Sequence, residues 1–169
     1  MKRRHLLQAG LAIGGAQALA MQSLWAAAAS LPAKTQVIVI GGGYGGATAA
    51  KYIRMLSDYK ISVLLVEPNN SFISCPMSNL VIGGSKTLAD LSTPYDTLMT
   101  RHGITLVRDR IIDIDVQKKS LRLLNGPNSG YDKLVVSPGV DMMFDTIEGL
   151  REANVEGQIL QAWKAGPDT

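Results

Sequence analysis

A glycine-rich turn between an apolar run and a small-residue segment constrains this chain more than any other feature. Residues 37–50 read VIVIGGGYGGATAA, and Gly41, Gly43 and Gly46 have the spacing G-x-G-x-x-G. The first glycine permits a sharp turn, the second lets phosphate approach the backbone, and the third allows close packing of helix on strand. The N–H groups that begin the helix favour an anion. This stretch, with Gly45 inside it, therefore predicts a site for a dinucleotide pyrophosphate.

The surroundings of the turn agree with this interpretation. Residues 37–40 are typical of a buried parallel strand, residues 47–56 of a helix, and residues 61–66 of a second strand. Glu67 follows that strand, 21 residues after Gly46, where an acid that binds ribose hydroxyls is expected. A carboxylate there would repel a 2′-phosphate, which favours FAD or NAD over NADP. A glycine turn in an ordinary α/β protein is the alternative.

The rest of the chain continues an α/β pattern. Apolar residues at helical spacing predict a helix over residues 88–102, and residues 104–107 are a candidate third parallel strand. Apolar or alternating runs at residues 111–116 and 120–124 predict an antiparallel β-meander, which returns the chain to the parallel sheet over residues 131–139.

The first 29 residues have the composition of an export signal. Lys2, Arg3 and Arg4 precede an uncharged run over residues 6–29 that ends in alanines. The adjacent arginines resemble a twin-arginine signal, a route that exports folded proteins with their cofactors. We therefore expect residues 1–29 to be a twin-arginine-type signal peptide, and the mature protein to be periplasmic without stable membrane insertion. The run is long enough to span a bilayer, so an uncleaved anchor is the alternative.

Charge and cysteine content exclude several other functions. The formal net charge of +3 equals the charge of Lys2, Arg3 and Arg4, so a chain that starts near Ser30 is formally neutral. No basic stripe with interleaved aromatic residues suggests nucleic-acid binding. Cys75 is the only cysteine, so no disulfide can form within the chain, and we predict no metal site.

Together these residues resemble the FAD domain of flavoproteins that carry two dinucleotide-binding domains, the wider pyridine nucleotide-disulfide oxidoreductase-like group. The shared features are the glycine fingerprint, Glu67 at a strand end, the meander, and the stretch YDKLVVSPG at residues 131–139. Gly139 matches a glycine near the FAD in that group, although Ser137-Pro138 stands where Ala-Thr is commoner. The resemblance implies a Rossmann-like FAD-binding domain, with parallel sheet and antiparallel β-meander.

A closer resemblance is to the flavoprotein subunits of flavocytochrome c sulfide dehydrogenases. The matching segments are residues 45–53, 66–69, 78–79, 81–84, 131–132, 138–139, 147–149 and 162–166, together with Cys75. This resemblance implies an FAD-dependent oxidoreductase that passes electrons from sulfide through FAD to a c-type cytochrome subunit. The sequence has no C-x-x-C-H, so the haem is expected on another chain.

Family members are much longer than this chain. We therefore expect residues 30–169 to be the N-terminal part of an incomplete FAD-binding domain, and the chain to be inactive alone. In the family a redox-active cysteine pair lies beyond the position of Thr169, so no catalytic residue is expected within the chain. A non-catalytic nucleotide-binding remnant is a further interpretation.

Three roles are open for Cys75. In flavocytochrome c the matching cysteine holds the flavin through an 8α-thioether, so the resemblance implies covalent FAD there. In single-cysteine NAD(P)H-dependent peroxidases and CoA-disulfide reductases, a thiol beside the flavin cycles through sulfenate or a mixed disulfide. A free cysteine can also act as a small apolar side chain. The C-x4-C dithiol of disulfide reductases is missing, since Leu80 holds its second position, and the export signal favours the first role.

Overall fold

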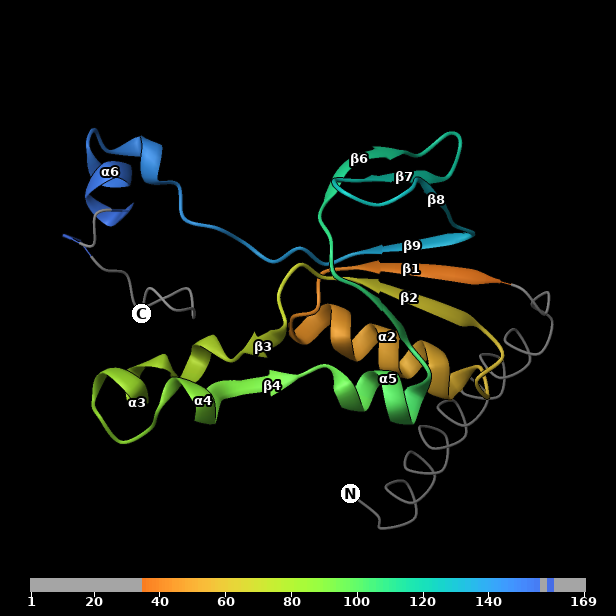
Figure 1. Ribbon diagram of the computed structural model, residues 1–169, viewed down its shortest axis with the longest axis horizontal. Coiled ribbons are helices and arrows are strands. Elements are labelled where there is room, and N and C mark those ends of the chain that lie inside the picture. Colours follow the sequence, from red (N-terminus) through yellow and green to blue (C-terminus); the bar gives the residue numbers. More distant parts are fainter. Residues whose placement is uncertain (1–34, 156–157, 160–169) are drawn as a thin grey trace, which may run out of the picture.

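The computed structural model describes residues 35–155 and 158–159. A four-stranded parallel sheet lies at its centre, with the strand order β5-β2-β1-β9 (Figure 1). These strands are β5 (Thr105–Val107), β2 (Ser62–Val66), β1 (Gln36–Ile40) and β9 (Lys133–Val136). Every neighbouring pair is parallel, so the carboxyl ends of all the strands meet at one edge of the sheet.

Both faces of the sheet are covered. Helices α2 (Tyr44–Leu56) and α5 (Asp96–His102) lie on one face. The antiparallel meander of β6 (Ile111–Asp115), β7 (Ser120–Leu123) and β8 (Ser129–Gly130) lies on the other (Figure 1). The predicted α/β architecture, a parallel sheet with an antiparallel meander, is therefore confirmed.

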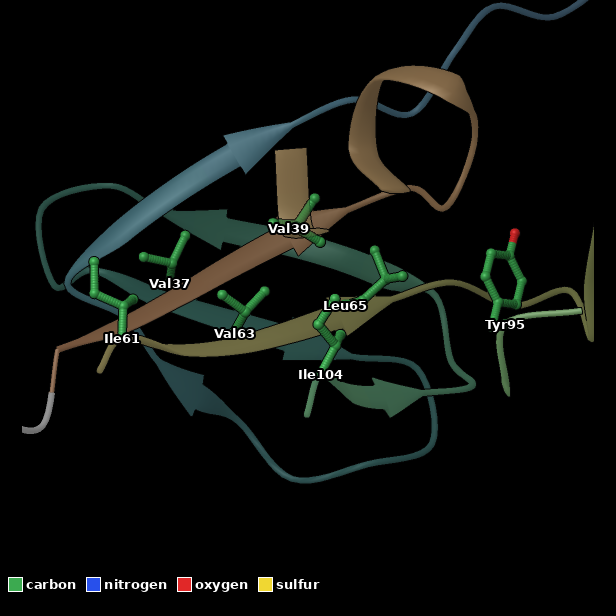
Figure 2. Packing of buried hydrophobic residues seen from close by; sticks show 8 residues of the cluster. Val37, Val39, Ile61, Val63, Leu65, Tyr95 and Ile104 are labelled. Carbon is green, nitrogen blue, oxygen red and sulfur yellow. The ribbon is translucent and has the colours of Figure 1, made fainter. Parts of the chain in front are cut away.

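Alternation along the strands divides the core into two clusters, because successive side chains of a strand point to opposite faces. The cluster on the helix face contains Val37, Val39, Ala50, Ile61, Val63, Leu65, Tyr95 and Ile104 (Figure 2). The cluster on the meander face contains Ile38, Val66, Leu121 and Leu123. Burial on both faces explains why β1 and β2 read as continuous apolar runs instead of alternating ones.

The segment between β2 and α5 is built from short elements. They are β3 (Ser71–Ile73), the 3-10 helix η1 (Cys75–Met77), α3 (Ser78–Ile82), α4 (Leu88–Leu91) and β4 (Ser92–Pro94). β3 and β4 pair in an antiparallel ladder in which Phe72 lies opposite Thr93. β3 lies beside the amino end of α2 (Figure 1), and the segment that carries Cys75 follows β3 along the chain.

The predicted helix over residues 88–102 is wrong as one element, because the chain is extended at β4. Thr87 and Asp90 form a capping box that begins α4, which lasts one turn. Pro94 has no N–H and disfavours helical backbone in the residue before it, so the helix cannot continue through this point. A new helix, α5, begins at Asp96 and ends at His102, the last residue of the predicted helix. Gly103 caps it with a left-handed φ of 60°.

The helix after the glycine turn starts earlier than expected, and two short helices follow β9. Helix α2 begins at Tyr44, three residues before the expected start, so the last glycines of the fingerprint are helical. After β9 the chain forms the 3-10 helix η2 (Phe144–Thr146) and α6 (Leu150–Val155). The expected signal peptide at residues 1–29 and the matching segment at residues 162–166 lie outside the described residues.

Candidate dinucleotide-binding site

Two glycines of the fingerprint are required by packing inside the protein. Gly41 has a φ of 92°, and a Cβ there would overlap the carbonyl oxygen of Ser137. A Cβ at Gly46 would overlap the carbonyl oxygen of Gly41 and lie 2.9 Å from its carbonyl carbon. The backbones of β1, α2 and the loop after β9 therefore approach each other more closely than any side chain allows.

The other two predicted glycines differ, because Gly43 lies toward open space and Gly45 faces the Ser137 side chain. Gly43 is the N-cap residue of α2, and a Cβ there would meet only the Phe72 ring, at 3.8 Å. A Cβ at Gly45 would lie 2.7 Å from the Ser137 hydroxyl oxygen. Because the first N–H groups of a helix have no partner within the helix, this end of α2 presents donors beside a bare backbone. Such a surface suits a phosphate group.

The Glu67 carboxylate is held at the end of β2 by backbone and side-chain donors. Only 7% of the residue is exposed. Its Oε2 accepts a hydrogen bond from the N–H of Gly42 at 2.7 Å. Its Oε1 accepts from the N–H of Asn69 at 2.9 Å and from the Asn69 side-chain amide at 2.7 Å. A carboxylate has about four acceptor positions, so one remains for a ligand hydroxyl.

Two adjoining cavities run along the carboxyl edge of the sheet. One, of about 480 Å³, extends from Gly41 and Glu67 to Asp109. The other, of about 400 Å³, extends from Gly41 and Glu67 to Cys75. Both are lined by Gly139 as well, so together they form an elongated groove over the strand ends, where open α/β sheets bind ligands. The glycine cradle and the oriented carboxylate in this groove fit a dinucleotide such as FAD.

The structure brings together nearly all the residues selected from the sequence. Gly41, Gly43, Gly45, Glu67, Cys75 and Gly139 line the groove. Gly46 does not line it, and contributes by letting α2 pack against the turn.

Cys75 lies at the start of η1, half-buried, on the side of the groove away from Asp109. Its neighbours are attached to the glycine loop, because the Tyr44 hydroxyl hydrogen-bonds the Ser74 hydroxyl. The Tyr44 ring also packs edge to face on Phe72, with 4.6 Å between ring centroids. These contacts hold the Cys75 segment next to the site expected for the cofactor.

Tyr95 is a site residue that the sequence interpretation missed. It is buried, and its hydroxyl donates to the Gly42 carbonyl oxygen at 3.2 Å. Burial first, and then the charge of Glu67, raise the pKa of the phenol, so it stays protonated and remains a donor. Glu67 thus holds the N–H of Gly42, and Tyr95 holds its carbonyl group. No local sequence pattern connects Tyr95 with Gly42, because the two residues lie 53 positions apart.

Asp109 is a second missed residue, at the other end of the groove. Its carboxylate accepts from the N–H groups of Arg110, Asn125 and Gly126 at 2.7, 3.0 and 2.8 Å. The Asn125 side-chain amide donates to it as well. Asp109 therefore joins the end of β5 to the turn after β7. The two donor residues in that turn, Asn125 and Gly126, could have been suspected because Asn-Gly is a common turn pair.

A fall in pH is expected to lower the free energy of unfolding of the protein, partly through Asp109. Burial disfavours its charged form, but the hydrogen bonds from Arg110, Asn125 and Gly126 outweigh burial and lower the pKa. A lowered pKa in the folded state contributes stability above the unfolded-state pKa, and this stability is lost as pH falls below about 4. Asp109→Asn should be less stable than the wild type at pH 7, with the difference narrowing toward pH 3. Urea midpoints across this range test the expectation, and a constant difference would contradict it.

Neither a membrane-spanning helix nor a cluster of metal ligands occurs in the described part of the chain. Within residues 35–155 and 158–159, no helix combines the length and apolar character needed to cross a bilayer. In the same residues, histidine, cysteine and acidic side chains do not gather in groups of three or more that could hold a metal ion.

Comparison with known proteins places this groove in a family context. A family model for pyridine nucleotide-disulphide oxidoreductases matches residues 35–165. The flavoprotein chain of flavocytochrome c sulfide dehydrogenase from Chlorobaculum thiosulfatiphilum is 59% identical over 46 residues, which are 27% of this chain and 94% of that sequence. The resemblance stated from the sequence is thereby confirmed.

Sulfide:quinone oxidoreductases are similar over a longer stretch. The mitochondrial enzyme of Dictyostelium discoideum is 28% identical over 118 residues, which are 70% of this chain and 26% of that one. The crystal structure of the Aquifex aeolicus enzyme superposes with a TM-score of 0.62 at 28% identity, covering 70% of this chain and 27% of that one. The chain thus spans about a quarter of the length of these relatives.

Proposed function

Because the chain belongs to the pyridine nucleotide-disulphide oxidoreductase family, we propose that it supplies the FAD-binding part of an oxidoreductase that takes electrons from sulfide. The observation that carries the proposal is the groove that contains the glycine cradle, Glu67 and Cys75 together. The similarity to a flavocytochrome c flavoprotein chain supports sulfide as the electron donor and a c-type cytochrome subunit as the acceptor.

Each part of the groove has a task in this proposal. The N–H groups at the start of α2 hold the pyrophosphate, and Gly43 leaves room for it. Glu67 accepts a hydrogen bond from a ribose hydroxyl, while Tyr95 and Asn69 keep the loop and the carboxylate in place. Gly139 lines the wall that the ring system approaches. FAD supplies the redox chemistry, since it accepts electron pairs and releases single electrons.

Cys75 is proposed to hold the flavin covalently through its Sγ. Its place in the same cavity as Gly43 and Gly139 supports this role. A covalent bond would keep the cofactor attached in the periplasm, where the composition of residues 1–29 suggests that the protein is exported. A single-cysteine NAD(P)H-dependent peroxidase or CoA-disulfide reductase would use the same thiol as its redox centre instead.

The flavin linkage can be tested by producing the full chain with FAD and precipitating it in acid. Flavin should remain in the pellet, and mass spectrometry should find it on the peptide that contains Cys75. Cys75→Ser is the matched control: it should release its flavin into the supernatant while still binding FAD reversibly. A Cys75 thiol that alkylates freely in the flavin-loaded protein would contradict covalent attachment.

The electron donor is tested in the oxidoreductase of which this chain forms the FAD-binding part, assembled with the cytochrome subunit. Sulfide should bleach the flavin absorption, and NADH should not. Bleaching by NADH together with a free Cys75 thiol would favour the peroxidase or disulfide-reductase alternative.

A further inference from the structure

A separate cavity of about 490 Å³ lies on the helix side of the sheet, beside the cofactor groove. Its walls come from α2, α4, β4, α5 and the segment around Phe72. Tyr44 and Phe72 line both this cavity and the part of the groove that contains Cys75. Their edge-to-face pair therefore forms the wall between the two spaces. The cavity shares the Gly43 edge with the proposed flavin site, which makes no use of the rest of it.

The lining of the second cavity has an apolar part and a cationic part. Phe72, Met77, Leu91 and Leu98 supply the apolar surface. Lys51 from α2 and Arg101 from the last turn of α5 supply the cationic part, and His102 beside Arg101 adds an imidazole. Asp90 is the one carboxylate among the lining residues, and it is occupied by the capping box, where it accepts from the Thr87 N–H at 2.8 Å.

The positive charges lie close together and are not neutralised. The pKa of His102 is lowered first by desolvation and then by the charges of Lys51 and Arg101, so the three groups lie within electrostatic reach of each other. Among the described carboxylates, none forms an ion pair with Lys51 or Arg101. His102 itself is held in place, because its ring stacks on Tyr59 and its carbonyl oxygen accepts from Arg54 Nε at 2.8 Å.

We propose that this cavity binds a small soluble organic anion, with a phosphate- or sulfonate-type head at Lys51, Arg101 and His102 and an apolar body against Phe72 and Leu98. Anionic oxygens would accept charge-assisted hydrogen bonds from the cationic side chains. The apolar body would remove the neighbouring side chains from water. An inorganic anion would make only the charge-assisted hydrogen bonds, and a neutral apolar molecule would make only the apolar contacts. The site does not depend on the identity of the cofactor.

His102 provides a specific readout, since His5 is the only other histidine in the chain. In the full chain carrying His5→Gln, the single remaining imidazole can be titrated by NMR with phenyl phosphate, inorganic phosphate or phenol. Phenyl phosphate should raise the pKa of His102 back toward the ordinary histidine range, because a bound anion favours the charged imidazole. Inorganic phosphate should require at least tenfold higher concentration for the same effect, and phenol should leave the pKa unchanged.

Two charge-removing variants test the head of the site. Lys51→Gln and Arg101→Gln should each weaken phenyl phosphate binding about tenfold, as expected for the loss of a hydrogen bond to a charged group. Lys118→Gln, in the exposed turn between β6 and β7, is the matched control and should bind normally. Backbone amide spectra of the variants report whether each still folds.

Three results would overturn the proposal. They are the absence of a His102 response to phenyl phosphate, an equal response to inorganic phosphate, and unchanged binding in folded Lys51→Gln and Arg101→Gln.

Discussion

Gly46→Ala is expected to destabilise the protein by about 4 kcal/mol or more, which lowers the melting temperature of a chain this size by roughly 10 °C. The new methyl group would overlap the Gly41 carbonyl oxygen and lie 3.3 Å from a methyl of Val39. Gly41 cannot move away from this methyl group, because its N–H donates to the Val66 carbonyl oxygen at 2.9 Å and Ser137 packs against its other side. Relief therefore requires α2 to move away from the sheet. Thermal unfolding of the full chain measures the effect.

Gly43→Ala is the matched control, because it adds the same methyl group to the same motif. At Gly43 the backbone has an ordinary φ of −69°, and the methyl would meet only Phe72 at 3.8 Å. Stability should change by less than about 0.5 kcal/mol, as for other unstrained surface substitutions. FAD binding should be lost, since the methyl occupies the side of the turn that phosphate must approach. Equal melting of the two variants, or normal FAD binding by Gly43→Ala, would contradict these roles.

Glu67→Ala is expected to weaken both folding and FAD binding. The substitution leaves the buried Gly42 N–H without its acceptor and removes the acceptor of both Asn69 donors. An unsatisfied buried donor costs about 1–3 kcal/mol, so unfolding should need that much less free energy in urea titrations. Loss of the charge-assisted bond to ribose should weaken FAD binding roughly ten- to hundredfold.

Two related variants separate the tasks of this carboxylate. Glu67→Gln keeps one oxygen and so can satisfy Gly42 or Asn69, but not both, and its stability should fall between the wild type and Glu67→Ala. Asn69→Ala removes one side-chain donor while leaving the carboxylate and its bond to Gly42 intact. It should lower FAD affinity much less than Glu67→Ala does. An Asn69→Ala variant as weak in FAD binding as Glu67→Ala would show that the carboxylate is not the ligand group.

Local sequence signals were sufficient to predict the centre of the fold. The strands β1 and β2 are apolar runs because both of their faces are buried, and the glycine spacing marks the close contact between β1 and α2. Each of these signals lies within a short window of sequence. The fingerprint glycines and Glu67 followed from the same windows, whereas Cys75 and Gly139 followed from the family resemblance. All of them except Gly46 line one groove.

The errors and omissions arose where distant segments meet. The expected helix over residues 88–102 has helical apolar spacing, but Pro94 interrupts it and the extended piece is stabilised by pairing with β3. Tyr95 falls within that expected helix, but it precedes α5, and its hydroxyl donates to the Gly42 carbonyl oxygen. Neither interaction has a periodic signature, since each depends on how separate elements pack.

The position of β1 between an early and a late strand has a consequence for the order of folding. β1 pairs with β2 on one side and with β9 on the other, and Gln36 and Asp132, 96 residues apart, exchange hydrogen bonds at the start of that second pairing. The Ser137 backbone that closes over Gly41 therefore arrives only after β9 has docked. A chain is synthesised at about 5–20 residues per second, so β9 emerges several seconds after β1. Long-range strand pairings of this kind also form slowly. The phosphate cradle is therefore incomplete until β9 has docked, and a dinucleotide that binds it would stabilise the finished sheet.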